Sequence, residues 1–137
     1  MTDAGTETLS VVVEREFPHP PEKVWRALTQ PHLIEEWLKM KNDFKPDEGH
    51  RFNLSAAWGA VDCQVLAVEP NKTLSYTWAA NGLESVVTWT LTRTSKGTHL
   101  RMEQSGFRPD QPQYYQDAKD GWQRFFANLE QVLARIK

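Results

Sequence analysis

Apolar and polar residues alternate at the start of the chain and through most of its middle. Leu9, Val11, Val13 and Phe17 share one side of an alternating run, and Arg15 is the single polar residue on that side. Alternation with a period of two is typical of a strand that buries one face. We therefore predict a first strand over residues 9–17.

A second alternating region covers residues 44–106 and predicts about five further strands. Alternation is blurred near Val65 and Leu66, which predicts a β-bulge there. Turn signals separate the runs, and Asn-Gly is the strongest of them because it suits a two-residue hairpin. These signals are Trp58-Gly59, residues 69–72, Asn81-Gly82 and residues 95–97.

Helical spacing replaces alternation in two short segments after the first strand. Pro21 fits the first turn of a helix, where its missing N–H costs nothing, and Val24 and Leu28 mark one face of that helix. Residues 29–31 interrupt it. Leu33, Ile34, Trp37 and Leu38 then have the spacing of a second short helix.

A long helix is predicted from about Pro112 to Ile136, with a length of roughly 37 Å at about 1.5 Å per residue. Its apolar stripe consists of Trp122, Phe125, Phe126, Leu129, Val132, Leu133 and Ile136. Gly121 lies inside this helix, where glycine costs about 1 kcal/mol relative to alanine. A compensating reason is expected, either a close approach to a sheet or a bend over a cavity.

The order of elements predicts an α+β fold with a curved antiparallel sheet of about six to seven strands. Strands grouped between helices indicate antiparallel pairing, and the long C-terminal helix has the length needed to lie across such a sheet. Residues 1–8 are polar and are expected to form a disordered tail. Residues 9–137 are expected to form one domain, as the chain length of 137 residues suggests.

A helix laid into a curved sheet leaves space at some points, and large side chains there fill or line it. Alternation and helical spacing direct several aromatic residues toward this space, and Gln104 is a polar residue on the same buried side. Plain core packing is the simpler interpretation of the aromatic set, and bonds to protein groups are the simpler interpretation of Gln104 and Arg15. The candidate ligand-binding residues are Trp37, Phe52, Leu54, Trp78, Trp89, Met102, Gln104, Trp122 and Phe125.

Composition narrows the possible functions. The chain has 16 Lys and Arg residues against 18 Asp and Glu residues, which argues against a nucleic-acid-binding surface. No apolar run approaches the roughly 20 residues that span a bilayer, and residues 1–10 lack a signal-peptide pattern, so a cytoplasmic location is expected. Cys63 is the one cysteine, and we interpret it as a small buried side chain rather than a catalytic thiol.

Catalytic signatures are not evident in the sequence. The four histidines lack the spacing of a helical metal pair, and a second cysteine for a thiolate site does not exist, so neither a metal nor a cofactor is expected. A cavity enzyme needs only one well-placed ionisable group. The candidates for such a group are Arg15, Glu84, His19, His32, His50 and His99.

Several segments together resemble the family related to the C-terminal domain of the activator of heat-shock protein 90 ATPase. The segments are VEREFPHPPEKVWRALTQPHLIEEWL, VEPNKTLSYTW, SVVTWTLTRTSKGTHLRMEQSGF and DGWQRFFANLEQVL. The resemblance covers nearly all of residues 9–136. It implies the helix-grip fold of the START-like (SRPBCC) superfamily, whose members share a hydrophobic cavity between the long helix and the sheet.

Three functions follow from this resemblance, in order of preference. The first is binding of a small hydrophobic or aromatic molecule in the cavity. The second is a cyclase- or hydratase-type reaction on such a ligand, and the third is a stress-related interaction with a chaperone or another partner. The co-chaperone activity itself is not transferred, because the eukaryotic activator has a separate N-terminal domain. The protein is expected to be a monomer or a homodimer.

Overall fold

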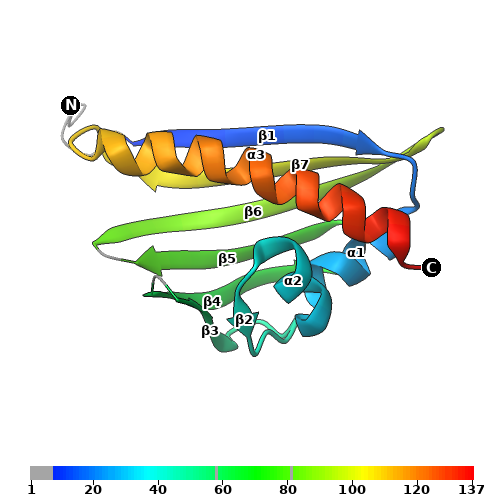
Figure 1. The fold of residues 1–137 in the computed structure, drawn as a ribbon, viewed down its shortest axis with the longest axis horizontal. Helices are drawn as coiled ribbons and strands as arrows, with labels where there is room; N and C mark the ends of the chain where they lie inside the picture. The colour runs from blue at the N-terminus through cyan, green and yellow to red at the C-terminus, as the bar shows by residue number, and fades with distance from the viewer. Residues whose placement is uncertain (1–7, 58, 81) are drawn as a thin grey trace.

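The structure, a computed structural model, describes residues 8–57, 59–80 and 82–137. It forms an α+β fold in which one seven-stranded antiparallel sheet carries three helices (Figure 1). The strands are β1 (Leu9–Phe17), β2 (Lys41–Asn42), β3 (Arg51–Ala56), β4 (Gly59–Glu69), β5 (Thr73–Ala80), β6 (Leu83–Thr94) and β7 (Gly97–Phe107). The helices are α1 (Pro21–Thr29), α2 (Pro31–Leu38) and α3 (Pro112–Arg135).

Consecutive hairpins build most of the sheet, and its strand order is β1-β7-β6-β5-β4-β3-β2. The first and last long strands of the chain therefore lie side by side at one edge. The helix α3 lies across the sheet near this edge, and α1 and α2 lie by its C-terminal half (Figure 1). Contacts of α3 with β1, β7, α1 and α2 hold it in this position.

Most of the predicted elements are confirmed. The first strand, the two short helices and the long helix lie where the periodicity placed them. The irregular alternation near Val65 is a real register shift between β4 and β5, located between Val65 and Ala67. The strand β2 was not predicted, because two residues are too few to show alternation.

Some predictions fall on residues outside the described ranges. These are the greater part of the predicted tail, residues 1–7, and the turn residues Trp58 and Asn81. The neighbouring strands are described: Ala56 pairs with Gly59 between β3 and β4, and Ala80 pairs with Leu83 between β5 and β6. The assignment of residues 9–137 to one domain stays a prediction.

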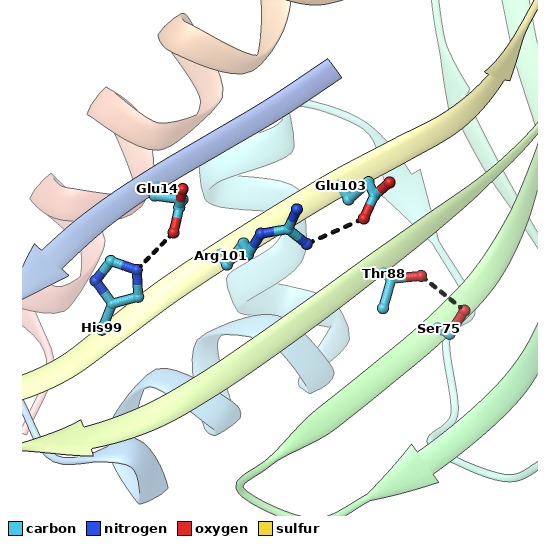
Figure 2. A network of polar contacts seen from close by, with 6 residues as sticks. All are labelled: Glu14, Ser75, Thr88, His99, Arg101 and Glu103. Atoms are coloured by element: carbon cyan, nitrogen blue, oxygen red, sulfur yellow. Dashed lines mark hydrogen bonds and ion pairs between the residues drawn. The ribbon is translucent and has the colours of Figure 1, made fainter. Parts of the chain in front are cut away.

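The two faces of the sheet differ in character. Polar side chains on the outer face pair with one another: His99 with Glu14 at 2.8 Å, Arg101 with Glu103 at 3.0 Å, and Ser75 with Thr88 at 3.3 Å (Figure 2). The residues that alternate with them in β7, Leu100, Met102 and Gln104, are buried toward the helices. The helix-facing side of the sheet is thus the face on which an apolar site has to lie.

Cys63 lies in β4 with 5% of its surface exposed, which confirms its interpretation as a small buried side chain. Burial, together with the neighbouring Asp62 carboxylate, raises the pKa of its thiol to about 12. Because the thiolate is the reactive form, we expect the folded protein at pH 8 to react with a disulfide reagent roughly 1,000-fold more slowly than the unfolded chain. Absorbance of the released thiol with and without guanidinium measures this ratio, and complete reaction of the folded protein within minutes would contradict it.

Candidate ligand-binding site

A cavity of about 470 Å³ lies between the N-terminal half of α3, the end of α2 and strands β4 to β7. This volume lies within the range of roughly 300–1,000 Å³ that is usual for small-molecule sites. Trp78 and Ala80 reach it from β5, Leu83 from β6, and Val61 from β4. Alternation in β4, β5 and β6 directs these side chains to the helix-facing side of the sheet.

The helix α3 forms the opposite wall of the cavity. The residues of this wall begin in the N-terminal half of the helix, before the apolar stripe of its C-terminal half. Tyr114, Ala118, Gly121, Trp122 and Phe125 all line the cavity, and their spacing of three and four residues places them along one side of the helix. Two of these residues are small. Alanine and glycine on this side of α3 leave space between the helix and the cavity-lining residues of β5 and β6.

Gly121 is buried but does not approach the sheet closely. A Cβ atom built on it would meet only the Phe125 side chain at 3.8 Å and the Arg124 guanidinium at 3.9 Å. Of the two predicted reasons for this glycine, a close approach to the sheet is therefore wrong. The glycine instead faces the cavity and leaves it open.

A buried chain of hydrogen bonds forms one end of the cavity. The Trp122 indole Nε1–H donates to Gln104 Oε1 at 2.7 Å, and Gln104 Nε2 donates to Ser85 Oγ at 2.9 Å. Ser85 Oγ donates in turn to the Trp78 carbonyl oxygen at 2.8 Å. Gln104 thus bonds to protein groups, which confirms the simpler of the two interpretations of this residue. A primary amide has two N–H groups and two acceptor lone pairs. These bonds therefore leave one N–H group and one lone pair of Gln104 without a partner among the described residues, and Gln104 lines the cavity.

Charged residues lie at the cavity's border with solvent. Lys39 follows the end of α2, and Asp117 and Arg124 lie on α3; all three are exposed and all three line the cavity. Asp117 accepts a hydrogen bond from Gln113 Nε2 at 2.7 Å. The lining is therefore apolar in the interior and polar at the mouth, which is the usual character of a small-molecule site.

Four of the nine predicted site residues line this cavity: Trp78, Gln104, Trp122 and Phe125. The other five are buried elsewhere on the helix-facing side. Trp37 donates its indole N–H to the Ala27 carbonyl oxygen at 2.8 Å, and Trp89 donates to Tyr76 Oη at 2.9 Å, so both are fixed in the core. Phe52 packs edge-on against Phe44 with ring centroids 4.9 Å apart. Leu54 and Met102 are completely enclosed by protein.

Four of the tryptophans nevertheless converge in the fold. Ring contacts connect Trp37 to Trp89 at 5.7 Å, Trp89 to Trp122 at 5.6 Å, and Trp122 to Trp78 at 5.6 Å between centroids. The first two residues of this series belong to the core and the last two border the cavity. Core packing and cavity lining are therefore parts of one aromatic cluster.

Sequence reasoning missed the small and polar lining residues, notably Lys39, Ala80, Ala118, Gly121 and Arg124. The sequence does contain a pattern that indicates Ala118 and Gly121 as lining residues. The helical face that contains Trp122 and Phe125 extends backward through residues 121, 118 and 114 at the same spacing. No comparable signal marks Lys39 or Ala80, because their contribution depends on segments distant in the chain.

The predicted catalytic candidates lie outside the described lining of this cavity. Arg15 is half-buried on the helix-facing side of β1, where its guanidinium lies 5.7 Å from the centre of the Phe126 ring and donates to Gln123 Oε1. Glu84 and His32 are exposed. His99 pairs with Glu14 on the outer face of the sheet (Figure 2).

His19 and His50, the other two candidates, lie on loops. His19 contacts the Lys23 ammonium at 3.2 Å, and its pKa is lowered by burial and by that ammonium. The ring of His50 stacks on Phe52 at 6.3 Å between centroids. Among the described residues, no group of three His, Cys, Asp or Glu side chains could hold a metal ion. Within the same part of the chain, no helix is long and apolar enough to cross a membrane.

Two solved structures are similar to this protein over more than nine-tenths of both chains. The protein MLL2253 from Mesorhizobium loti is 68% identical, with a TM-score of 0.90 over 94% of this chain and 99% of that chain. Protein BH1534 from Bacillus halodurans is 28% identical, with a TM-score of 0.81 over 91% of this chain and 96% of that chain.

A third structure, DynU16 from the dynemicin biosynthetic locus, is also 28% identical, with a TM-score of 0.81. The match covers 92% of this chain and 47% of DynU16, so this chain spans about half of that protein. No curated protein sequence matches the chain.

Residues 18–134 match the family described as Activator of Hsp90 ATPase homolog 1-like protein. The matched range begins at the end of β1 and extends almost to the end of α3, so it includes every element that lines the cavity. The sheet that grips α3 is the helix-grip fold of the START-like superfamily. The chain therefore belongs to the Activator of Hsp90 ATPase homolog 1-like family.

Proposed function

We propose that this protein binds a small hydrophobic or aromatic molecule in the cavity between α3 and strands β4 to β7. The observation that carries the proposal is the cavity of about 470 Å³, walled by Trp78, Trp122 and Phe125. Burying a ligand of drug size against such walls is favourable by roughly 25 cal/mol per Å² of apolar surface removed from water. The unused amide groups of Gln104 supply a polar contact that orients the ligand.

The similarity to DynU16, about half of which this chain spans, is consistent with a small-molecule ligand, since that protein comes from the dynemicin biosynthetic locus. A cyclase- or hydratase-type reaction would need an ionisable group against the bound ligand. The candidates from the sequence, Arg15, Glu84 and the histidines, lie away from the described lining. The charged residues that do line the cavity, Lys39, Asp117 and Arg124, are exposed at its mouth and not in its apolar interior. We therefore propose binding and assign no reaction, and no observation on the structure favours the chaperone-associated alternative over it.

The substitution Gly121→Trp tests the proposal directly. A side chain at this position extends into the cavity, because a Cβ atom there has only ordinary contacts with Phe125 and Arg124. We expect the variant to bind the neutral fluorescent probe N-phenylnaphthylamine at least about 50-fold more weakly than the wild type, since the occupied volume is no longer available to a ligand. A fluorescence titration measures the dissociation constants.

Gly121→Ala is the matched control, because it adds one methyl group and removes the helix penalty of glycine. It is expected to bind the probe within about threefold of wild type and to raise the free energy of unfolding by up to about 1 kcal/mol. Ala80→Trp blocks the cavity from β5 and serves as a second variant if Gly121→Trp folds poorly. Unchanged probe binding in both blocked variants would place the site elsewhere and overturn the proposal.

A further inference from the structure

The side chain of Arg124 is directed toward the mouth of the cavity. Side chains on a helix lean toward its N-terminus and cover the residue three or four positions earlier, which for Arg124 is Gly121. Because that residue has no side chain, the guanidinium lies over it, with Nη2 3.9 Å from where a Cβ atom would stand. Among the described residues, Arg124 has no hydrogen bond or ion pair through its side chain.

Lys39 approaches the same mouth from a different element. It is the C-cap of α2 and adopts a left-handed conformation with φ of 63°, which ends the helix at Leu38. Its exposed side chain lines the cavity and, within the described part of the chain, pairs with no carboxylate. Two segments separated by about 85 positions therefore bring two unpaired cations to one opening.

The remaining charged residue at the mouth is Asp117. Its carboxylate already accepts a hydrogen bond from Gln113, so it is partly satisfied on its own helix. Two cationic side chains against one carboxylate leave this border with a net positive charge, although the whole chain has a formal net charge of −2. A local excess of this sign attracts an anion.

We propose that the ligand is an amphipathic acid: an aromatic body in the cavity and an anionic group, such as a carboxylate or sulfonate, held at the mouth by Lys39 and Arg124. This inference rests on the proposed binding function and adds the chemical class of the ligand. The guanidinium donates paired hydrogen bonds to a planar anion, and the ammonium adds a second positive charge. A ligand bound in this way keeps its charge near water and buries only its apolar part.

Two probes that share one aromatic scaffold test this inference. Anilinonaphthalene sulfonate carries an anionic group, and N-phenylnaphthylamine does not. The double substitution Lys39→Gln/Arg124→Gln is expected to weaken binding of the sulfonate probe about 5- to 20-fold at low salt and to change binding of the neutral probe less than about twofold. Added salt is expected to reduce the affinity of wild type for the sulfonate probe and to have little effect in the double variant.

Two control variants separate the local effect from net charge. Lys96→Gln removes a positive charge in the β6–β7 turn, at the opposite end of β6 from Leu83, and is expected to leave both affinities unchanged. Asp117→Asn is expected to strengthen binding of the sulfonate probe by about twofold, because it removes the one carboxylate at the mouth. Thermal unfolding of each variant is measured to separate a binding effect from a loss of the folded state.

The outcomes distinguish the inference from the function on which it rests. If the double variant affects both probes equally, or affects neither, while Gly121→Trp still abolishes binding, the anionic class is wrong and the binding function stands. If neither probe binds wild type saturably, or if Gly121→Trp and Ala80→Trp both leave binding intact, both are overturned. Selective loss of the sulfonate probe in the double variant, with Lys96→Gln unchanged, supports the inference.

Discussion

Replacing Gly97 by alanine is expected to lower the free energy of unfolding by roughly 4 kcal/mol. Gly97 begins β7 with φ of 146°, and a Cβ atom there would lie 2.2 Å from the Phe17 carbonyl oxygen and 2.6 Å from the His19 nitrogen. Both atoms belong to the backbone, so no side-chain rotation relieves the clash. The segment that leaves β1 would have to separate from the β6–β7 turn.

That separation would also break a hydrogen bond. Thr98 Oγ1 donates to the His19 carbonyl oxygen at 2.7 Å and ties the same two segments together. Because β1 and β7 are neighbours in the sheet, a displacement at Gly97 is transmitted to their pairing. A loss of about 4 kcal/mol is a large part of the 5–15 kcal/mol that stabilises a typical domain.

Gly49→Ala is the matched control for this prediction. Gly49 also has a positive φ, of 87°, but a Cβ atom there would meet nothing within 4 Å. We expect it to cost only the left-handed strain of about 1–2 kcal/mol. Urea unfolding followed by tryptophan fluorescence measures both variants, and equal losses would show that the close approach at Gly97 is not the cause.

Trp122→Ala is expected to reduce the free energy of unfolding by about 3–5 kcal/mol, as is usual for removal of a large buried aromatic side chain. The Trp122 ring is 2% exposed and contacts Trp78, Trp89 and Phe125 with centroid distances of 5.6, 5.6 and 5.3 Å. Its loss leaves these rings without a common neighbour and merges its volume with the cavity. Denaturant unfolding measures the change, and a loss below about 1 kcal/mol would contradict this view of the core.

A cycle of substitutions isolates the hydrogen bond of Trp122 from its packing. Trp122→Phe keeps an aromatic ring but leaves Gln104 Oε1 without its indole donor, for which we expect a loss of about 1–3 kcal/mol. In the double variant Trp122→Phe/Gln104→Leu both partners are apolar. Its loss of unfolding free energy should be smaller than the sum of the losses in Trp122→Phe and Gln104→Leu. Strict additivity would show that the bond contributes little.

Removal of the Trp122 side chain also affects the proposed site. The same residue fixes Gln104 and forms a wall, so its removal is expected to change both the shape and the polarity of the cavity. Gly121→Trp acts differently, because it fills the space and leaves the core contacts in place. The two substitutions therefore separate loss of binding through a damaged fold from loss of binding through occupied volume.

The amino-acid sequence alone determined the kind, the order and the approximate limits of nearly all elements. Alternation and helical spacing are local properties, and each is produced by one segment packing one face against the rest of the molecule. This is why the bulge near Val65 and the limits of α3 were predictable, and why β2, with two residues, was not. The resemblance of several segments to one family indicated the same fold.

Only the tertiary structure decided which of the inward-facing residues fill the core and which border the cavity. Trp89 and Trp78 both face the helices from neighbouring strands, yet Trp89 is fully enclosed and Trp78 lines the space. The difference comes from what lies opposite on α3, where Ala118 and Gly121 leave room. Periodicity specifies the face on which a side chain lies, but the volume left beside it depends on residues brought together from distant parts of the chain.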